Sequence, residues 1–214
     1  MSRATTVPTA FTVSTLSVVF FSGTGTTDLL AQAIGEGAAS VAGVQVKLLR
    51  VTGEQIDKGR WQDDAVLEAL SASDAIVFGS PTFMGGAAAP FKAFADATAG
   101  IWYGRGWVGK FAGGFTISGS PSGDKLHTLA YFNLLAAQHG MTWLNWNELP
   151  HQPDGTNRLA SFMGLMAQNG GAPGSPPALD PADALSAGKY GRYLAQQVRR
   201  YAVVSQPEAV ALAA

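Results

Sequence analysis

The sequence predicts an α/β fold in which a parallel sheet is covered by helices on both faces. Apolar runs rich in β-forming residues alternate along the chain with amphipathic segments that favour helices. Several runs are continuously apolar, as expected for strands that are buried on both faces. Loops rich in Gly, Ser and Thr follow three of these runs. We expect one domain over residues 1–214, with a core at about 15–201.

Five segments have the character of strands. TLSVVFF at 15–21 is a continuous run of β-forming residues, and DAIVFGS at 74–80 is similar. The other three strands are predicted at 44–51, 110–118 and 141–146.

Five helices are predicted between and after these strands. Four of them are expected at 27–41, 63–73, 88–98 and 124–138. A last helix opens at Asp180-Pro181, because Asp is a good N-cap and Pro is tolerated in the first helical position.

One long segment breaks the alternation. Residues 147–180 are rich in Gly and Pro and precede the last helix. A loop of this length in a compact domain is either functional or a surface excursion. Its apolar centre, LASFMGLMA at 159–167, indicates that it packs on something.

Composition excludes several classes of function. The 214 residues are 47% hydrophobic and 14% charged, which favours a substantial core over disorder. The formal net charge of -1 predicts neither nucleic-acid binding nor attraction to an anionic membrane. The chain has no Cys, so disulfides, thiolate catalysis and zinc–thiolate sites are excluded.

The N-terminal segment 1–23 carries an Arg but no long apolar region, because Ser and Thr interrupt it. We therefore expect no signal peptide, no membrane insertion and a cytoplasmic location.

Ligands of such folds bind beyond the carboxyl ends of the strands, where three unusual loops are expected. The first loop enters the helix at 27–41, and glycines there let backbone N–H groups approach a ligand while hydroxyls add donors. This arrangement suits a phosphate without any Lys or Arg. The residues of this loop are Ser22, Gly23, Thr24, Gly25, Thr26 and Thr27.

The second and third loops suit a planar ring. GSPTFMGG at 79–86 places Phe83 and Met84 where an exposed loop is usually polar. ISGSPSGDK at 117–125 combines small side chains with backbone donors that can meet ring carbonyls. Together the three loops predict a phosphorylated planar cofactor lying across the strand ends.

The chain resembles the flavodoxin-like FMN proteins and, within them, the WrbA family of NAD(P)H:quinone oxidoreductases, also called tryptophan-repressor-binding proteins. The resemblance is carried by Ser22-to-Thr27, by DAIVFGSPTFMGG at 74–86, by TAGIWYGRGWVGKFAGGFTISGS at 98–120 and by AAQHGM at 136–141. It implies a doubly wound, five-stranded parallel sheet with strand order 2-1-3-4-5.

The resemblance also implies site residues. Residues 22–27 would hold the FMN phosphate, and Trp102 would line the substrate pocket. His139 would approach the flavin. The ring and ribityl chain would be bordered by Pro81, Thr82, Phe83, Met84 and Gly85, and the other edge of the ring by Ser118, Gly119, Ser120, Pro121, Ser122 and Gly123. No metal is implied.

The implied activity is the two-electron reduction of a quinone by NAD(P)H through FMN. NAD(P)H and quinone would use one place in turn, so ping-pong kinetics are expected and no side chain need be a covalent nucleophile. The alternatives are a flavodoxin-type electron carrier, a non-catalytic FMN-binding regulatory protein, and a free-FMN or azo-dye reductase.

Assembly into a homo-oligomer, a dimer or a tetramer, is expected. The resemblance implies a tetramer with FMN near subunit contacts. The apolar side chains of segment 159–166 would otherwise form an exposed patch of the kind that marks an interface.

Overall fold

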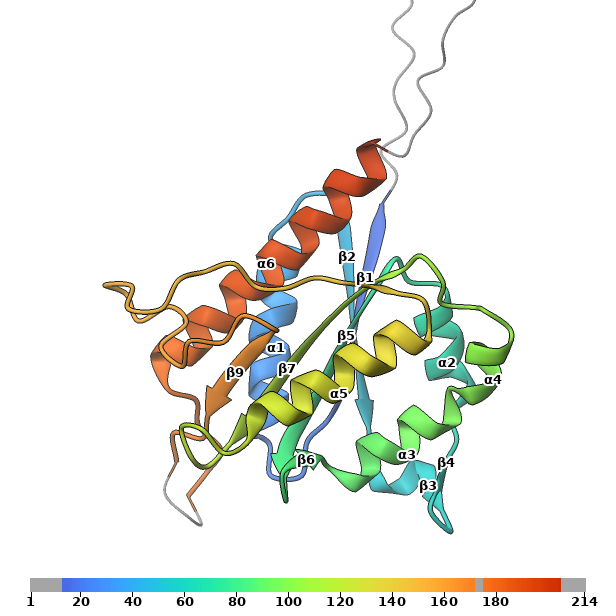
Figure 1. Cartoon of the computed structure of the whole chain (residues 1–214), viewed down its shortest axis with the longest axis horizontal. Coiled ribbons are helices and arrows are strands. Elements are labelled where there is room, and N and C mark those ends of the chain that lie inside the picture. The colour runs from blue at the N-terminus through green and yellow to red at the C-terminus, as the bar shows by residue number, and fades with distance from the viewer. Residues whose placement is uncertain (1–12, 172–174, 205–214) are drawn as a thin grey trace, which may run out of the picture.

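The computed structural model describes residues 13–171 and 175–204. Its main sheet has the strand order β2-β1-β5-β7-β8 (Figure 1), which confirms the predicted order 2-1-3-4-5. The strand pairs along this path are parallel, with Ser14 opposite Val44, Leu16 opposite Ala75, and Ala75 opposite Phe111. All carboxyl ends of these strands therefore lie along one edge of the sheet, called here the carboxyl edge.

The strands agree closely with the predicted segments. The main sheet contains β1 (Ser14–Phe21), β2 (Val44–Val51), β5 (Ala75–Phe83), β7 (Phe111–Ser118), β8 (Thr142–Trp143) and β9 (Leu165–Gln168), with β6 (Gly86–Ala87) paired antiparallel to β5. A separate small hairpin joins β3 (Ile56–Asp57) and β4 (Arg60–Trp61).

Helices cover both faces of the sheet, as predicted. They are α1 (Thr26–Ala39), α2 (Asp64–Ser71), α3 (Ala89–Ala97), α4 (Ala99–Tyr103), α5 (Lys125–Gln138) and α6 (Pro181–Val204), with a short 3-10 turn, η1, at Gly53–Gln55. Helices α1 and α6 bury their apolar side chains in one core, and α2, α3 and α5 bury theirs in a second core on the opposite face. The short helix α4 was not predicted from the sequence.

The last helix begins where its capping residues predict. Pro181 is its first residue, and the carboxylate of Asp180 accepts a hydrogen bond from the Ala182 amide at 2.8 Å. No helix of the described part of the chain is both long enough and apolar enough to cross a bilayer.

Helices α1 and α6 touch through glycines. A Cβ added at Gly37 would lie 1.9 Å from the carbonyl oxygen of Gly188, and one added at Gly191 would lie 1.9 Å from that of Ile34. Only a residue without a side chain allows the two backbones to approach this closely.

The fifth strand position is shared by two segments, which corrects the prediction of one strand at 141–146 and of a structureless excursion at 147–180. Strand β8 pairs with the start of β7 at Phe111, and β9 pairs with its end from Phe115 to Ser118. The chain thus leaves the sheet after Trp143 and returns to it at Leu165. The apolar run at 159–167 is therefore partly a sheet strand, because Leu165 and Ala167 are fully buried.

A buried ion pair ties this insertion to α6. The guanidinium of Arg158 donates two hydrogen bonds of 2.8 Å to the Asp183 carboxylate, which is 1% exposed. The same carboxylate accepts the backbone N–H of Gln168 from β9. Asp183 therefore fixes the return of the chain to the carboxyl edge.

Candidate functional site

A cavity of about 440 Å³ opens at the carboxyl edge of the sheet. It lies where loops leave β1, β5, β7 and β9, at the place that the fold class predicts for a ligand. The predicted site residues that line it are Gly23, Thr24, Thr26, Pro81, Thr82, Phe83, Ser118 and Gly119, and the other lining residues are Phe21, Ala88, Ala89, Pro90, Ile117 and Asn169.

The first loop presents free backbone donors at the start of α1. The amides of Gly23, Thr24, Thr26 and Thr27 have no acceptor among the described residues. These N–H groups and the positive end of the helix dipole favour a bound anion. Ser22 lies behind the loop, because its hydroxyl accepts the amides of Gly25 at 3.1 Å and Asp28 at 3.2 Å.

Two other segments hold this loop in place. Gly25 has a φ of +94°, and a Cβ there would lie 2.9 Å from Cγ of Pro177, which precedes α6. Arg50, at the end of β2, donates a hydrogen bond of 3.0 Å to the Ser22 carbonyl. The loop thus combines a glycine conformation with support from both sides.

The second loop is a hairpin with an apolar tip. Strand β5 turns into β6 through Met84 and Gly85, which both have positive φ, at 49° and 79°. Phe83 is 71% exposed and Met84 is 94% exposed, which is unusual for apolar side chains. Among Phe83, Met84 and Gly85, only Phe83 lines the cavity.

Side chains from β5, β7 and α5 fix the hairpin. The Ser80 hydroxyl accepts the Ala88 amide at 2.9 Å, and His127 Nδ1 lies 2.6 Å from the Gly85 carbonyl oxygen. The Thr82 hydroxyl lies 2.8 Å from that of Thr116 and 2.7 Å from that of Thr128. Thr82 therefore borders the cavity while its hydroxyl belongs to a network between β7 and α5.

Residues of the third loop border two different cavities. Ser118 and Gly119 line the 440 Å³ cavity, whereas Pro121 and Ser122 border a separate hollow of about 1180 Å³. Gly123 has a φ of +53°, and a Cβ there would lie 2.2 Å from Oγ of Ser118. The loop is therefore tightly folded against its own first residue.

The structure does not bring His139 to the cavity of its own chain, so the implied approach of His139 to the flavin is not made within one chain. His139 follows α5, which starts at the carboxyl edge and ends at the opposite edge, where β8 begins. Its side chain is 3% exposed, with Nε2 2.9 Å from the Thr98 hydroxyl and its ring 4.4 Å from the Trp107 ring. Burial lowers the pKa of His139 to about 4.

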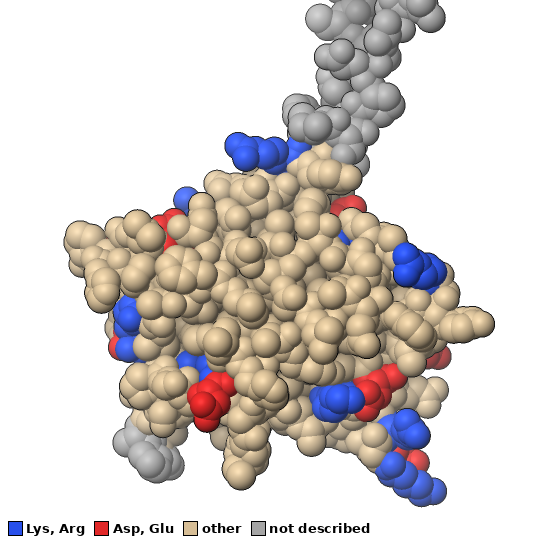
Figure 2. All heavy atoms as spheres, viewed as in Figure 1, with Lys and Arg blue, Asp and Glu red and all other residues tan. Residues whose placement is uncertain are grey.

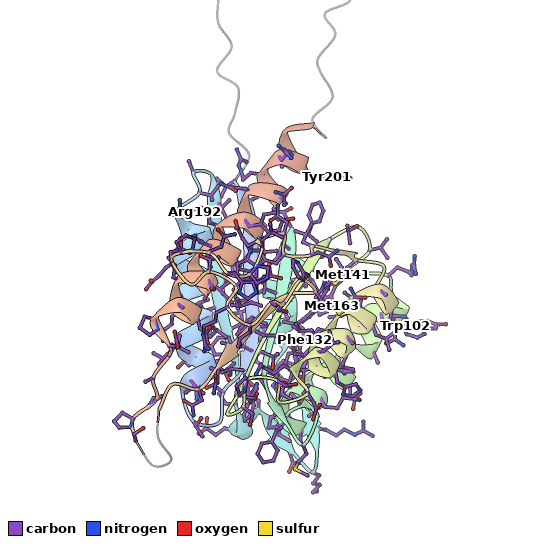
Figure 3. The ribbon with its side chains drawn as sticks, turned by 60° about the vertical axis from the view of Figure 1, so that its left-hand side comes forward. Trp102, Phe132, Met141, Met163, Arg192 and Tyr201 are labelled. Atoms are coloured by element: carbon purple, nitrogen blue, oxygen red, sulfur yellow. The ribbon has the colours of Figure 1, made fainter. Side chains whose placement is uncertain are left out.

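Trp102 also lies away from the cavity. It belongs to α4, which follows α3 at the far end of that helix, and it projects from the periphery of the molecule (Figure 3). Its side chain is 49% exposed. Trp102 therefore does not line the cavity of its own chain.

Sequence reasoning missed two parts of the cavity. Asn169 comes from the end of β9, which was hidden in the segment predicted as an excursion. The start of α3, with Ala89 and Pro90, forms another wall. The sequence carried no usable signal for Asn169, because the four residues LMAQ at 165–168 are too few for their pattern to distinguish a strand from a packed loop.

The cavity suits a phosphorylated planar group. Free amides lie at one end, and Pro81, Phe83 and Pro90 supply apolar walls for a ring. Its volume falls in the range of small-molecule sites.

Comparisons with known proteins agree with this geometry. The chain matches the NADPH-dependent FMN reductase family over residues 16–152. Flavodoxin FldP of Pseudomonas aeruginosa is 37% identical over 158 residues, which are 71% of this chain and 79% of that protein. The NAD(P)H dehydrogenase (quinone) of Chromohalobacter salexigens is 36% identical over 139 residues, which are 60% of this chain and 69% of that protein.

A solved structure supports the same assignment. The flavodoxin, WrbA-like protein from Agrobacterium tumefaciens is 36% identical and has a TM-score of 0.67, covering 87% of this chain and 98% of its own. The Trp repressor binding protein from Bacillus subtilis, at 14% identity and a TM-score of 0.55, shares the fold. The chain belongs to the NADPH-dependent FMN reductase family and is a WrbA-like flavoprotein.

Proposed function

We propose that this flavoprotein is an FMN-dependent NAD(P)H:quinone oxidoreductase that reduces quinones by two electrons in a ping-pong mechanism. Family membership implies FMN as cofactor and NAD(P)H as electron donor. The observation that carries the proposal is that the free amides of the first loop and the apolar walls formed by Pro81, Phe83 and Pro90 border the same cavity.

The residues of the cavity have distinct parts in this proposal. The free amides of Gly23, Thr24, Thr26 and Thr27 bind the FMN phosphate, and Ser22 preorganises that loop from behind. Pro81 and Phe83 pack against the ring, and Ser118 and Gly119 border its other edge. Bound FMN supplies hydride acceptance and electron transfer, while the chain supplies position and the exclusion of water.

Binding of FMN and riboflavin tests the phosphate site. The protein should bind FMN with a Kd in the micromolar range or below and riboflavin much more weakly, because only FMN reaches the first loop with a phosphate. Equal affinities, measured by quenching of flavin fluorescence, would contradict the assignment of the first loop.

Steady-state kinetics test whether NAD(P)H and quinone bind in turn at the same site. Initial rates with NADPH and benzoquinone should give parallel double-reciprocal lines. Intersecting lines would mean that both substrates bind together and that the ping-pong mechanism is wrong.

An electron carrier is the second candidate, because the flavodoxin of Pseudomonas aeruginosa is among the relatives. Strong negative charge suits carriers that dock on basic partners, and the net charge of -1 gives this chain little of it. FMN binding without NADPH–benzoquinone turnover would favour the carrier or a regulatory protein.

We further propose a single-domain, cytoplasmic homo-oligomer, a dimer or a tetramer. Its contacts would include residues 159–166, where Phe162 is 46% exposed, and the exposed apolar side chains Leu126 and Leu134 of α5, each 59% exposed. The face over α5 carries few charged side chains, which gather instead toward the rim (Figure 2). Since Trp102 lies away from its own cavity, it would reach substrate only at the cavity of a second copy.

Light scattering of the wild type and of Phe162→Asp tests this assembly. The wild type should be an oligomer, and the exposed position of Phe162 makes Phe162→Asp dissociate without unfolding. A monodisperse wild-type monomer would contradict the proposed contact.

A further inference from the structure

Lys125 is the first residue of α5, and its side chain is fully buried beneath the third loop. Its ammonium donates three hydrogen bonds, to the Ser118 hydroxyl at 2.9 Å, the Ser120 carbonyl at 2.6 Å and the Pro121 carbonyl at 2.9 Å. An ammonium has three N–H donors, so every donor of Lys125 is satisfied by this one loop.

No carboxylate of the described chain forms an ion pair with Lys125. The acid whose charge acts on Lys125 is Asp183, whose two oxygens already accept hydrogen bonds from the Arg158 guanidinium. Burial lowers the pKa of Lys125, and the charge of Asp183 partly opposes this effect. A buried charge is costly unless hydrogen bonds compensate it, so the loop oxygens are what keep this cation in place.

The same loop turns its other carbonyl groups toward the protein. The Ser118 carbonyl accepts the Asn169 amide at 2.9 Å, and the Gly119 carbonyl accepts the Gln168 side chain at 3.2 Å. The carbonyls of residues 118–121 are thus all held by Lys125, Gln168 or Asn169.

This arrangement determines where the amides of the loop point. In a trans peptide the N–H is directed opposite to the preceding C=O, and the described chain has no cis peptide. The carbonyls of Ser118 and Gly119 point toward Asn169 and Gln168, so the amides of Gly119 and Ser120 point away from those two residues. The Pro121 carbonyl points toward Lys125, so the Ser122 amide points away from Lys125. These amides have no acceptor among the described residues.

We propose that Lys125 is a positioning residue of the cofactor site: it holds the Ser118 hydroxyl and the carbonyls of Ser120 and Pro121, and so keeps the third loop in the shape in which its free amides can meet acceptor atoms of the flavin ring. Gln168 assists it from β9. The inference rests on the proposed flavin site and extends it, because it assigns to a buried lysine the recognition of the ring rather than of the phosphate. The positive charge also favours the reduced flavin, which carries more negative charge.

Lys125→Met tests the proposal, since Met keeps much of the side-chain volume and removes the charge. Lys110→Met is the matched control, because Lys110 binds two carbonyls, those of Ser71 and Ser73, at the opposite edge of the sheet. Binding of FMN and riboflavin, the midpoint potential of bound FMN and, in the flavin-free protein, the backbone order parameters of residues 119–123 would be measured for both variants.

Lys125→Met should weaken the binding of FMN and of riboflavin by the same factor, about tenfold or more, because both ligands contain the ring. Its midpoint potential should fall, and the order parameters of the loop should drop from about 0.85 to below about 0.6. Lys110→Met should match the wild type in all three measurements. Unchanged flavin affinity and an ordered loop in folded Lys125→Met would overturn the proposal.

If Lys125→Met fails to fold, Gln168→Ala tests the proposal instead. This substitution removes only the hydrogen bond from the Gln168 side chain to the Gly119 carbonyl. It should weaken both flavins by the same smaller factor, about threefold. Unchanged affinity and loop order in this variant would equally overturn the proposal. If the wild type itself bound no flavin, the proposed function would fail, while the order parameters would still decide the role of Lys125.

Discussion

The stability of the protein should fall in mild acid because His139 is buried as a neutral base. The Thr98 hydroxyl donates to the Ala95 carbonyl at 2.7 Å, so it can only accept from His139, and Nε2 therefore carries the proton. Nδ1 is buried and has no partner in the described chain. Protonation would place an unpaired N–H and a charge against the Trp107 ring.

The magnitude follows from the difference in pKa between the folded and the unfolded chain. Burial lowers the pKa of His139 to about 4, whereas an unfolded His has a pKa of about 6.5. Between these values the unfolded chain binds more protons, so the free energy of unfolding decreases as the pH falls from about 7 to about 4. The full loss from this one group is about 3 kcal/mol at most.

Urea denaturation at several pH values between 7.5 and 4.5 measures this loss. His139→Gln removes the titrating group and keeps a donor for Thr98, so its stability should depend less on pH than that of the wild type. The exposed His151 offers a matched control, since His151→Gln should retain the wild-type dependence. Parallel stability curves for the wild type and His139→Gln would refute the reasoning, as would protonated Nδ1 seen by NMR at pH 5.

Three further predictions concern single substitutions. Gly37→Ala should lower the free energy of unfolding by about 2 kcal/mol or more, because its Cβ would collide with the Gly188 carbonyl, and urea denaturation would show it. Arg158→Ala should cost about 3 kcal/mol by the same assay, because it leaves the Asp183 carboxylate buried without its partner, and an unchanged midpoint would contradict this. Thr24→Ala should weaken FMN about tenfold in fluorescence titration and leave riboflavin unchanged, and equal losses for both flavins would argue against a phosphate contact.

The sequence determined the elements of the fold because buried parallel strands need continuous apolar runs. TLSVVFF at 15–21 matches the largely buried strand β1 to within one residue, and the Asp180-Pro181 signal gave the start of α6. It also located the three loops, since ligand sites in this fold class lie after strand ends.

The strand–helix topology alone predicts that His139 lies at the opposite edge of the sheet, whereas the resemblance of its motif suggested a place near the flavin. A helix that follows a parallel strand runs back to the other edge of the sheet, so a residue at its far end is separated from the loop at its start. The motif AAQHGM carries no information about this direction.

Only the tertiary structure decided the partners of buried polar groups and the course of the fifth strand. Nothing in the sequence singled out Lys125, because its three acceptors are brought to it only by the folding of the loop above it. Likewise, LMAQ at 165–168 is too short for its pattern to distinguish a strand from a packed loop, and its pairing with β7 made it one. Hydrophobic periodicity depends on neighbours along the chain, whereas the shape of the cofactor site depends on hydrogen bonds between segments that the sequence keeps far apart.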